Sequence, residues 1–160
     1  MAATAFGQQG WAAGPTLTGL NSAAIASGAA PVTSGIVANP FLSGSSALAI
    51  YADLVLTLGT AETATSAGGW IAAAILKAST ASIVETARVS GNQLYPFDDD
   101  RYGQAAIVPS AAYTSGELIV IGGLLVPRSP YIAVAVFNNS SFSIPTTATW
   151  TLELAGGDIG

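Results

Sequence analysis

The sequence predicts an all-β protein, an antiparallel β-sandwich of the jelly-roll kind with an extended N-terminal arm. Two observations predict the sandwich: apolar and polar residues alternate in several short runs, and loops rich in Gly, Pro, Asn and Ser separate these runs. A third observation predicts the arm, because residues 1–45 follow neither the period of a strand nor that of a helix. We therefore expect an arm over residues 1–45 and a sandwich domain over residues 46–160.

The predicted arm consists mainly of Ala, Gly, Ser, Thr and Pro, with isolated large side chains between them. Such a segment has no periodic core of its own, so we expect it to lie extended on a partner and to be anchored by its large side chains. The anchor candidates are Phe6, Trp11, Leu17, Phe41 and Leu42. Two alternatives are edge strands of the same domain and a low-complexity leader.

The domain is predicted to begin with a strand at residues 50–58, where Ala52, Leu54 and Leu56 share one face and Asp53 and Thr57 the other. The next run, residues 70–76, contains three alanines that would permit a helix, but its shortness and the two preceding glycines favour a strand. Further strands are expected at residues 82–89, 105–108, 117–121, 131–137 and 147–154.

The chain is poor in charge, with 9 acidic and 4 basic residues among 160. These make 8% of the chain, where soluble domains ordinarily carry roughly 25%. The surface must therefore consist of small polar residues in water or of apolar atoms against a partner. The net charge of −5 provides no cationic surface, so we expect no direct binding of nucleic acid. Pro, Gly and Ser interrupt the apolar stretches, so we expect no membrane insertion.

Enzymatic chemistry has few side chains to use, because the chain contains neither Cys nor His. Nucleophilic triads that need His are excluded, and carboxylate pairs are the acid-base pairs that remain. The glutamates lie singly along the chain, at Glu62, Glu85, Glu117 and Glu153. We expect no catalytic residues, no cofactor and no enzymatic activity.

One dense acidic cluster, Asp98, Asp99 and Asp100, is a weak candidate for a calcium site. Calcium needs several oxygen ligands that converge on one point, whereas adjacent Asp side chains in an extended loop point in different directions. A solvated turn, in which Arg101 neutralises a neighbour, explains the cluster better. We therefore expect no metal.

The aromatic side chains could line a platform for stacking sugars, but a structural role is the better explanation for most of them. Trp70 and Trp150 lie inside apolar or alternating runs, so we expect both in the sandwich interior. Trp11 is the partner anchor already named. The segment Asn138 to Ser141 is predicted to be a hairpin turn.

Two stretches resemble a family of small virion structural proteins of tailed bacteriophages, which includes capsid decoration, cement and tail-associated proteins. The first comprises residues 51–60 (YADLVLTLGT) and 69–72 (GWIA), and the second comprises residues 125–141 (LVPRSPYIAVAVFNNSS). The resemblance is a pattern of strands and turns over residues 46–155, and it transfers no functional residue. It implies a protein of assembly.

Composition and resemblance together predict a non-enzymatic decoration or cement protein that binds the major capsid protein and copies of itself, with a homotrimer expected. The first basic side chain after the amino terminus is Lys77, so we expect no secretory signal and assembly into the virion within a host cytoplasm. The alternative is a host-surface carbohydrate-binding module of a phage tail or head fibre. Its binding loops would be residues 59–69 and 92–103.

Overall fold

The computed structural model describes residues 12–39, 51–65, 68–84, 89–90, 93–94, 103–109 and 111–155. All the regular secondary structure in these residues is β, in antiparallel sheets, which confirms the prediction of an all-β, antiparallel protein. No helix long enough and apolar enough to cross a membrane occurs in this part of the chain.

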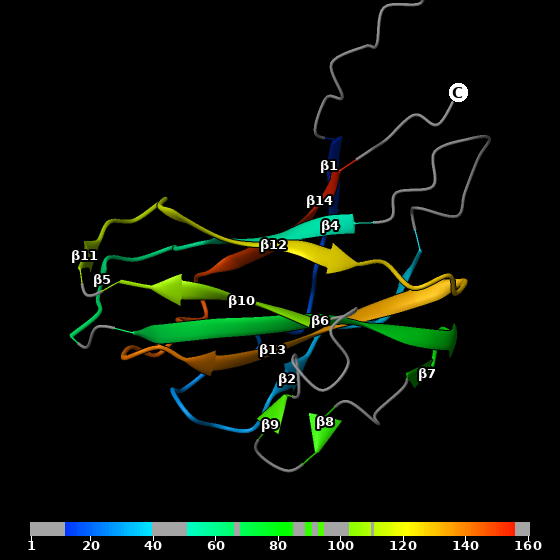
Figure 1. Ribbon diagram of the computed structural model, residues 1–160, viewed down its shortest axis with the longest axis horizontal. Coiled ribbons are helices and arrows are strands. Elements are labelled where there is room, and N and C mark those ends of the chain that lie inside the picture. Colours follow the sequence, from blue (N-terminus) through cyan, green and yellow to red (C-terminus); the bar gives the residue numbers. More distant parts are fainter. Residues whose placement is uncertain are drawn as a thin grey trace, which may run out of the picture.

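Two larger sheets contain most of the strands (Figure 1). The first sheet has the order β1 (Ala12–Thr16), β14 (Thr149–Ala155), β4 (Tyr51–Thr57), β12 (Leu118–Leu125). The second has the order β10 (Gly103–Val108), β6 (Gly69–Thr80), β13 (Tyr131–Asn139), β2 (Val32–Thr33), and it also includes β3 (Val37–Ala38) on β13 and β7 (Ile83–Val84) on β6.

Two short pairs accompany these sheets. They are β5 (Glu62–Thr63) with β11 (Ala112–Tyr113) and β8 (Val89–Ser90) with β9 (Gln93–Leu94). The β5–β11 pair joins the loop that follows β4 to the loop that follows β10, so it lies at the end of the molecule where β4 leads into β6 (Figure 1).

The strand pairs are nested along the chain. β1 pairs with β14, β2 with β13, β4 with β12 and β6 with β10, so early strands pair with late ones and the innermost pair is formed by strands close in sequence. Two further pairings, β14 with β4 and β13 with β6, join these pairs into the two sheets. The chain therefore passes repeatedly from one sheet to the other.

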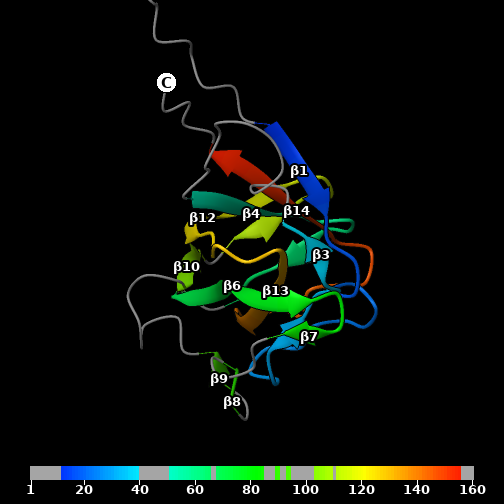
Figure 2. The ribbon, with the colours of Figure 1, turned by 90° about the vertical axis from the view of Figure 1, so that its right-hand side faces the viewer.

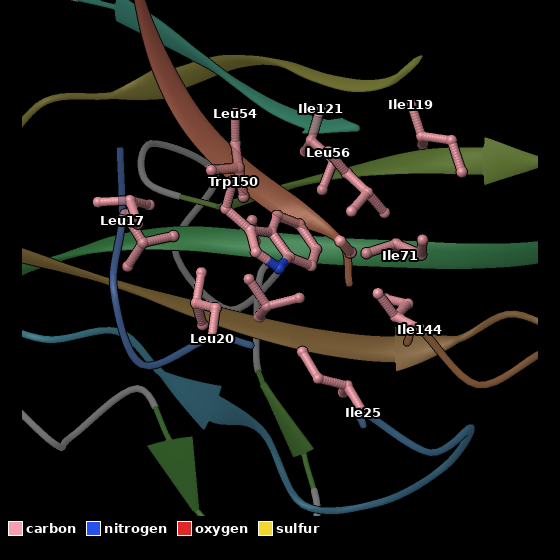
Figure 3. Packing of buried hydrophobic residues seen from close by; sticks show 14 of the residues in the cluster. Leu17, Leu20, Ile25, Leu54, Leu56, Ile71, Ile119, Ile121, Ile144 and Trp150 are labelled. Carbon is pink, nitrogen blue, oxygen red and sulfur yellow. The ribbon is translucent and has the colours of Figure 1, made fainter. Parts of the chain in front are cut away.

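The hydrophobic core lies between the two sheets. From the first sheet Leu54, Leu56 and Trp150 point inward, and from the second sheet Ile71 and Val134 do so; all five are at most 1% exposed. Figure 3 shows Trp150 in the middle of this packing. Alternation along β4 and β14 is thus the alternation predicted from sequence, with one face buried and the other partly wet.

The outer face of the second sheet is also apolar and buried. It carries a second hydrophobic cluster of Ala72, Ala74, Leu76, Ala135 and Phe137, against which Trp70 and Ala105 pack. Strand β9 approaches both β6 and β13. Because both faces of β6 and β13 are buried, these strands are continuously apolar rather than alternating.

Residues 12–39 belong to the same domain instead of extending away from it. Strand β1 is an edge of the first sheet, and β2 and β3 pair with β13 in the second. Leu17, Leu20 and Ile25 are at most 2% exposed and lie in the core. For these residues the structure agrees with one alternative to the arm, namely strands that belong to the same domain. The arm is not observed in this segment, because pairing with β13 and β14 satisfies its backbone hydrogen bonds within the chain.

A β-bulge distorts β12 at the edge of the first sheet. One extra residue lies between Ile121, paired with Leu54, and Leu124, paired with Ala52. Gly123 adopts φ 74°, a left-handed conformation that glycine reaches without strain, and its N–H donates to Asp53 Oδ1 at 2.8 Å. Such a bulge increases local twist and hinders strand addition at the edge.

Asp53→Ala should lower the free energy of unfolding by about 1 kcal/mol, because the Gly123 N–H loses a charged acceptor at a site open to solvent. Glu153→Ala is the matched control, since Glu153 is paired directly with Asp53 across β4 and β14. It should instead stabilise by a few tenths of a kcal/mol, about the effect of removing a like-charge cross-strand pair. Urea unfolding of both variants checks the opposite signs, and equal shifts would contradict the assigned roles.

Candidate interaction surface

Of the predicted anchors, Leu17 is the one that the structure describes, and its assignment to a partner contact is corrected. Its side chain is 2% exposed and lies in the core, and its N–H donates to the carbonyl oxygen of Trp150 at 2.8 Å. A partner cannot reach a side chain that the protein's own two sheets enclose. Outside the described residues lie Phe6, Trp11, Phe41 and Leu42, as well as Asp98, Asp99 and Asp100.

The acidic side chains whose contacts are known hold local backbone structure. Asp53 accepts from the bulge at Gly123, and Glu117 Oε2 accepts from the Thr114 N–H at 2.8 Å. Glu62 Oε1 accepts from the Thr60 hydroxyl at 3.1 Å. In the described ranges no three His, Cys, Asp or Glu side chains gather where they could hold a metal ion. These contacts stabilise local turns.

The surroundings of Tyr113 raise the pKa of its phenol. Burial, and secondarily the negative charge of Glu117, raise the pKa of its phenol above 10.0. The hydroxyl donates to the Pro109 carbonyl oxygen at 2.9 Å, and the ring contacts Phe142 with centroids 5.9 Å apart. These contacts fasten the loop after β10 to the turn before β14.

The raised pKa of Tyr113 predicts a loss of stability in alkali. The unfolded chain releases this proton near pH 10.0, whereas the folded chain retains it to higher pH. The group therefore leaves the free energy of unfolding unchanged below pH 10 and lowers it progressively above that pH. Urea unfolding at about pH 9 and pH 11 should show a smaller decrease for Tyr113→Phe than for the parent chain, and equal decreases for the two chains would contradict this role of Tyr113.

Large apolar side chains remain exposed at two places near one edge of the molecule. We name Leu118 and Val120, on the outer face of the first sheet, the β12 patch; they are 56% and 47% exposed. Ile107 on β10 is paired with Trp70 on β6, and both side chains lie on the outer face of the second sheet. We name these two residues the β10 patch; Ile107 is 74% exposed and Trp70 is half-buried. Tyr51, 51% exposed, lies at the far end of the first sheet.

The two patches lie at the same end and the same side of the molecule. Leu118 is paired with Thr57, where β4 ends, and Ile107 with Trp70, where β6 begins. Strands β10 and β12 run side by side where the edges of the two sheets meet, as both views show (Figures 1 and 2). The patches therefore flank a single edge, one on each outer face.

The residues paired with the β12 patch on β4 and β14 are uncharged. Leu118 is paired with Thr57 on β4, which is paired in turn with Thr149 on β14. Val120 is likewise paired with Val55, which is paired with Thr151. Methyl and hydroxyl groups therefore cover this part of the outer face of the first sheet. The acidic residues described on the same face, Asp53 and Glu153, are paired with each other further along β4 and β14. Such a surface loses little favourable hydration when another apolar surface covers it.

Sequence reasoning missed both patches. Residues 118–121 (LIVI) are apolar at every position, although the strand has one face toward solvent. The absence of alternation in an edge strand was the signal that could have revealed the β12 patch. Trp70 was also misplaced: Trp150 lies in the core as predicted, but Trp70 lies on the outer face of β6, where its ring contacts Phe137 with centroids 5.3 Å apart.

The segment Asn138 to Ser141 is not a hairpin turn as predicted. Strands β13 and β14 lie in different sheets, and the turn carries the chain between them. Asn138 is 1% exposed, and its amide contacts both Ile25 and Phe142, so the turn also holds the N-terminal segment.

Comparison with known proteins gives no relative: no family model, no curated protein and no solved structure matches the chain significantly.

Proposed function

We propose that the two sheets form a β-sandwich of jelly-roll topology. A jelly roll contains eight strands arranged as two Greek keys in two sheets. The nested pairs support this proposal, because β1, β2, β4, β6, β10, β12, β13 and β14 pair first with last, second with seventh, third with sixth and fourth with fifth. In this scheme β3 extends the second strand and the short β5–β11 pair joins two loops.

The proposed function is that of a non-enzymatic virion structural protein, a capsid decoration or cement protein that binds the major capsid protein and copies of itself, with a homotrimer expected. The two uncharged apolar patches are the observation that carries it: a chain with 13 charged residues exposes Ile107, Leu118 and Val120 at one edge. Jelly rolls are common in viral capsid domains, which agrees with this role.

Particle binding tests the proposal. Purified full-length protein is incubated with capsids of the encoding phage from which this protein has been stripped, and bound copies are counted by quantitative mass spectrometry. We expect binding that saturates at a fixed number of copies per capsid and raises the temperature at which the capsid opens. Absence of the protein from purified virions, together with no binding to stripped capsids, would overturn the proposal.

The contribution of the N-terminal residues is tested with Phe6→Ser plus Trp11→Ser in the full-length chain. If these residues anchor the protein on the capsid, the double variant should keep its melting temperature and lose affinity for the capsid. A deletion that extends through residues 12–39 is unsuitable, because it removes β1 to β3 and the core side chains of Leu17, Leu20 and Ile25.

A second candidate is the carbohydrate-binding module of a tail or head fibre. The half-buried indole of Trp70 favours it, because Trp70 is paired across the sheet with Asn139, an exposed residue whose amide can hydrogen-bond a sugar hydroxyl. A glycan array with the parent chain and Trp70→Ala decides between the two functions. Binding that depends on Trp70 favours this second function, and a blank array across host glycans contradicts it.

A further inference from the structure

We propose that the turn between β12 and β13, residues 127–130 (PRSP), is an inhibitory loop for serine proteases that cleave after basic residues. In this role Arg128 enters the specificity pocket of the protease, and Asn39 keeps the turn intact. The inference goes beyond the proposed function and does not rest on it. The turn follows the end of β12 that lies furthest from Leu118, so it is separate from the β12 patch.

Arg128 is presented to solvent as a single charged side chain. It is exposed, whereas its two neighbours, Pro127 and Ser129, are buried. In the part of the chain that the structure describes, no hydrogen bond or ion pair holds Arg128. Its guanidinium can therefore form a bidentate pair with a carboxylate of a partner. Trypsin-like serine proteases carry such a carboxylate, an aspartate, in the pocket that selects basic residues.

Asn39 clamps this turn from a distant part of the chain. Its Nδ2 group donates to the carbonyl oxygens of Pro127 at 3.0 Å and Ser129 at 2.8 Å, and its backbone N–H donates to that of Pro130 at 2.9 Å. Pairing of β3 with the start of β13 places Asn39, the residue after β3, beside the turn. Asn39 is 4% exposed, so water competes little for these bonds. The clamp thus joins the residue before Arg128 to the residue after it.

The carbonyl group of Arg128 is left out of this clamp. The carbonyl oxygens of Pro127, Ser129 and Pro130 all accept from Asn39, whereas that of Arg128 accepts from no group among the described residues. A serine protease binds this same atom, because its oxyanion hole donates backbone N–H groups to the carbonyl oxygen of the residue in the specificity pocket. The turn therefore leaves free both groups of Arg128 that such a protease binds.

The turn is held in one conformation before a partner binds. Pro127 and Pro130 fix their own φ angles and restrict the residues that precede them. Ser129 donates through its N–H to the Pro127 carbonyl oxygen at 3.0 Å and through its hydroxyl to that of Tyr131 at 2.7 Å. Binding then orders little backbone, so more of the contact energy is available as affinity. Rigid interface backbones are typical of protease–inhibitor complexes.

The clamp also explains why the turn should inhibit and not be consumed. In cleavage, the protease serine oxygen attacks the Arg128 carbonyl carbon and forms an ester. The Arg128–Ser129 peptide bond breaks, and the Ser129 nitrogen leaves as an amine with a proton from the protease histidine. Water hydrolyses the ester, giving an Arg128 carboxylate and the free protease, once this amine has moved away. Asn39 bonds on both sides of the broken peptide, so it keeps the amine beside the ester and the reverse step re-forms the bond.

Inhibition of trypsin tests the proposed role of Arg128. The full-length chain is titrated against trypsin and a chromogenic arginine substrate. We expect competitive inhibition by the parent and by Arg128→Lys, whose ammonium also suits an acidic pocket. Arg128→Ala should inhibit about 100-fold more weakly, a loss in the range of interface hot spots. Lys77→Ala, the matched control, removes an exposed cation elsewhere and should inhibit like the parent.

Two results of this titration would overturn the inference. One is no inhibition by the parent at about 0.1 mM, which means that the contact is too weak to matter. The other is equal inhibition by Arg128→Ala, because this variant keeps every other basic residue and trypsin would then be binding at one of those.

Asn39→Ala tests the clamp. The variant loses the bonds on both sides of the Arg128–Ser129 peptide, so trypsin should cleave that bond at least about tenfold faster than in the parent, measured by mass spectrometry of the fragments. Ser34→Ala is the matched control. It removes another buried side-chain bond to β13, from the Val134 N–H to Ser34 Oγ, without touching the turn, so it should leave the peptide intact.

Circular dichroism confirms that both variants are folded at the assay temperature, and Asn39→Ser replaces Asn39→Ala if the latter is not. Rapid cleavage of the parent at this bond would overturn the inference, and so would equal cleavage of the Asn39 and Ser34 variants. Capsid binding by Arg128→Ala should match that of the parent, which keeps the outcome for the turn distinct from the outcome for the proposed function.

Discussion

Trp150→Ala should be among the most damaging single substitutions in the described core, lowering the free energy of unfolding by about 3–5 kcal/mol. The indole is 1% exposed and lies between the two sheets, with Leu17 and Leu20 from the N-terminal segment on one side and Leu54 and Leu56 from β4 nearby (Figure 3). Its removal leaves a cavity that two hydrogen-bonded sheets cannot collapse to fill. Urea unfolding followed by circular dichroism measures the loss.

Trp70→Ala is the matched control, because the same side chain is removed from the outer face of the second sheet. Trp70 is half-buried and contacts Phe137, so we expect a distinctly smaller loss. Equal losses for the two variants would show that Trp150 does not occupy the centre of the core.

Trp150→Phe examines a second property of this side chain. The Nε1–H of Trp150 is buried and has no hydrogen-bond acceptor in the described part of the chain. An unpaired buried donor costs about 1–3 kcal/mol, so removing it offsets part of the packing lost with the smaller ring. We therefore expect Trp150→Phe to retain most of the stability that Trp150→Ala loses. A loss as large as that of Trp150→Ala would mean that the indole N–H is hydrogen-bonded.

Asn138→Ala should lower the free energy of unfolding by about 3–5 kcal/mol, although it removes only a small polar group. The Nδ2 group donates to the carbonyl oxygens of Ile25 and Phe142, each at 2.8 Å. Oδ1 accepts from the Ser140 N–H at 2.9 Å and from its hydroxyl at 2.6 Å. With Asn138 1% exposed, the substitution leaves several buried polar groups without this partner and out of reach of water.

Asn139→Ala is the control for Asn138→Ala, since the adjacent side chain is exposed and its removal should change stability by less than about 0.5 kcal/mol. Limited proteolysis adds a local measurement. Because the Asn138 amide holds Ile25, the Asn138 variant should be cleaved faster within residues 19–30, and the Asn139 variant should not. Equal cleavage of both variants would contradict this role of Asn138.

Strands could be predicted from the sequence where one face of the strand contacts solvent, because their residues then alternate between apolar and polar. Strands β4 and β14 were found from their alternation, and β6 was correctly assigned as a strand because its glycine neighbours and length outweighed its alanines. The run at residues 82–89 was predicted as one strand, whereas the structure describes short segments at Ile83–Val84 and Val89–Ser90 that pair with different partners. Pairing of two-residue strands depends on neighbours distant in sequence, which a local pattern does not contain.

The surface was less predictable than the strands. Leu17 reads as an isolated anchor because its neighbours are small and polar, yet its burial depends on Trp150, more than 130 residues further along the chain. Ile107 lies in an apolar run that predicts burial, and it is exposed because β10 is an edge strand and this position faces outward. Both assignments require knowledge of strand order.

The sequence alone determined that this protein is all-β and poor in the side chains of catalysis, because alternation and composition are local properties of the chain. Tertiary structure decided that residues 12–39 are strands of the domain, that Asn138 holds them, and that apolar side chains flank the edge formed by β10 and β12. The physical reason is the nested pairing. It places early residues beside late ones, so the burial of each side chain depends on a partner strand far away in the sequence.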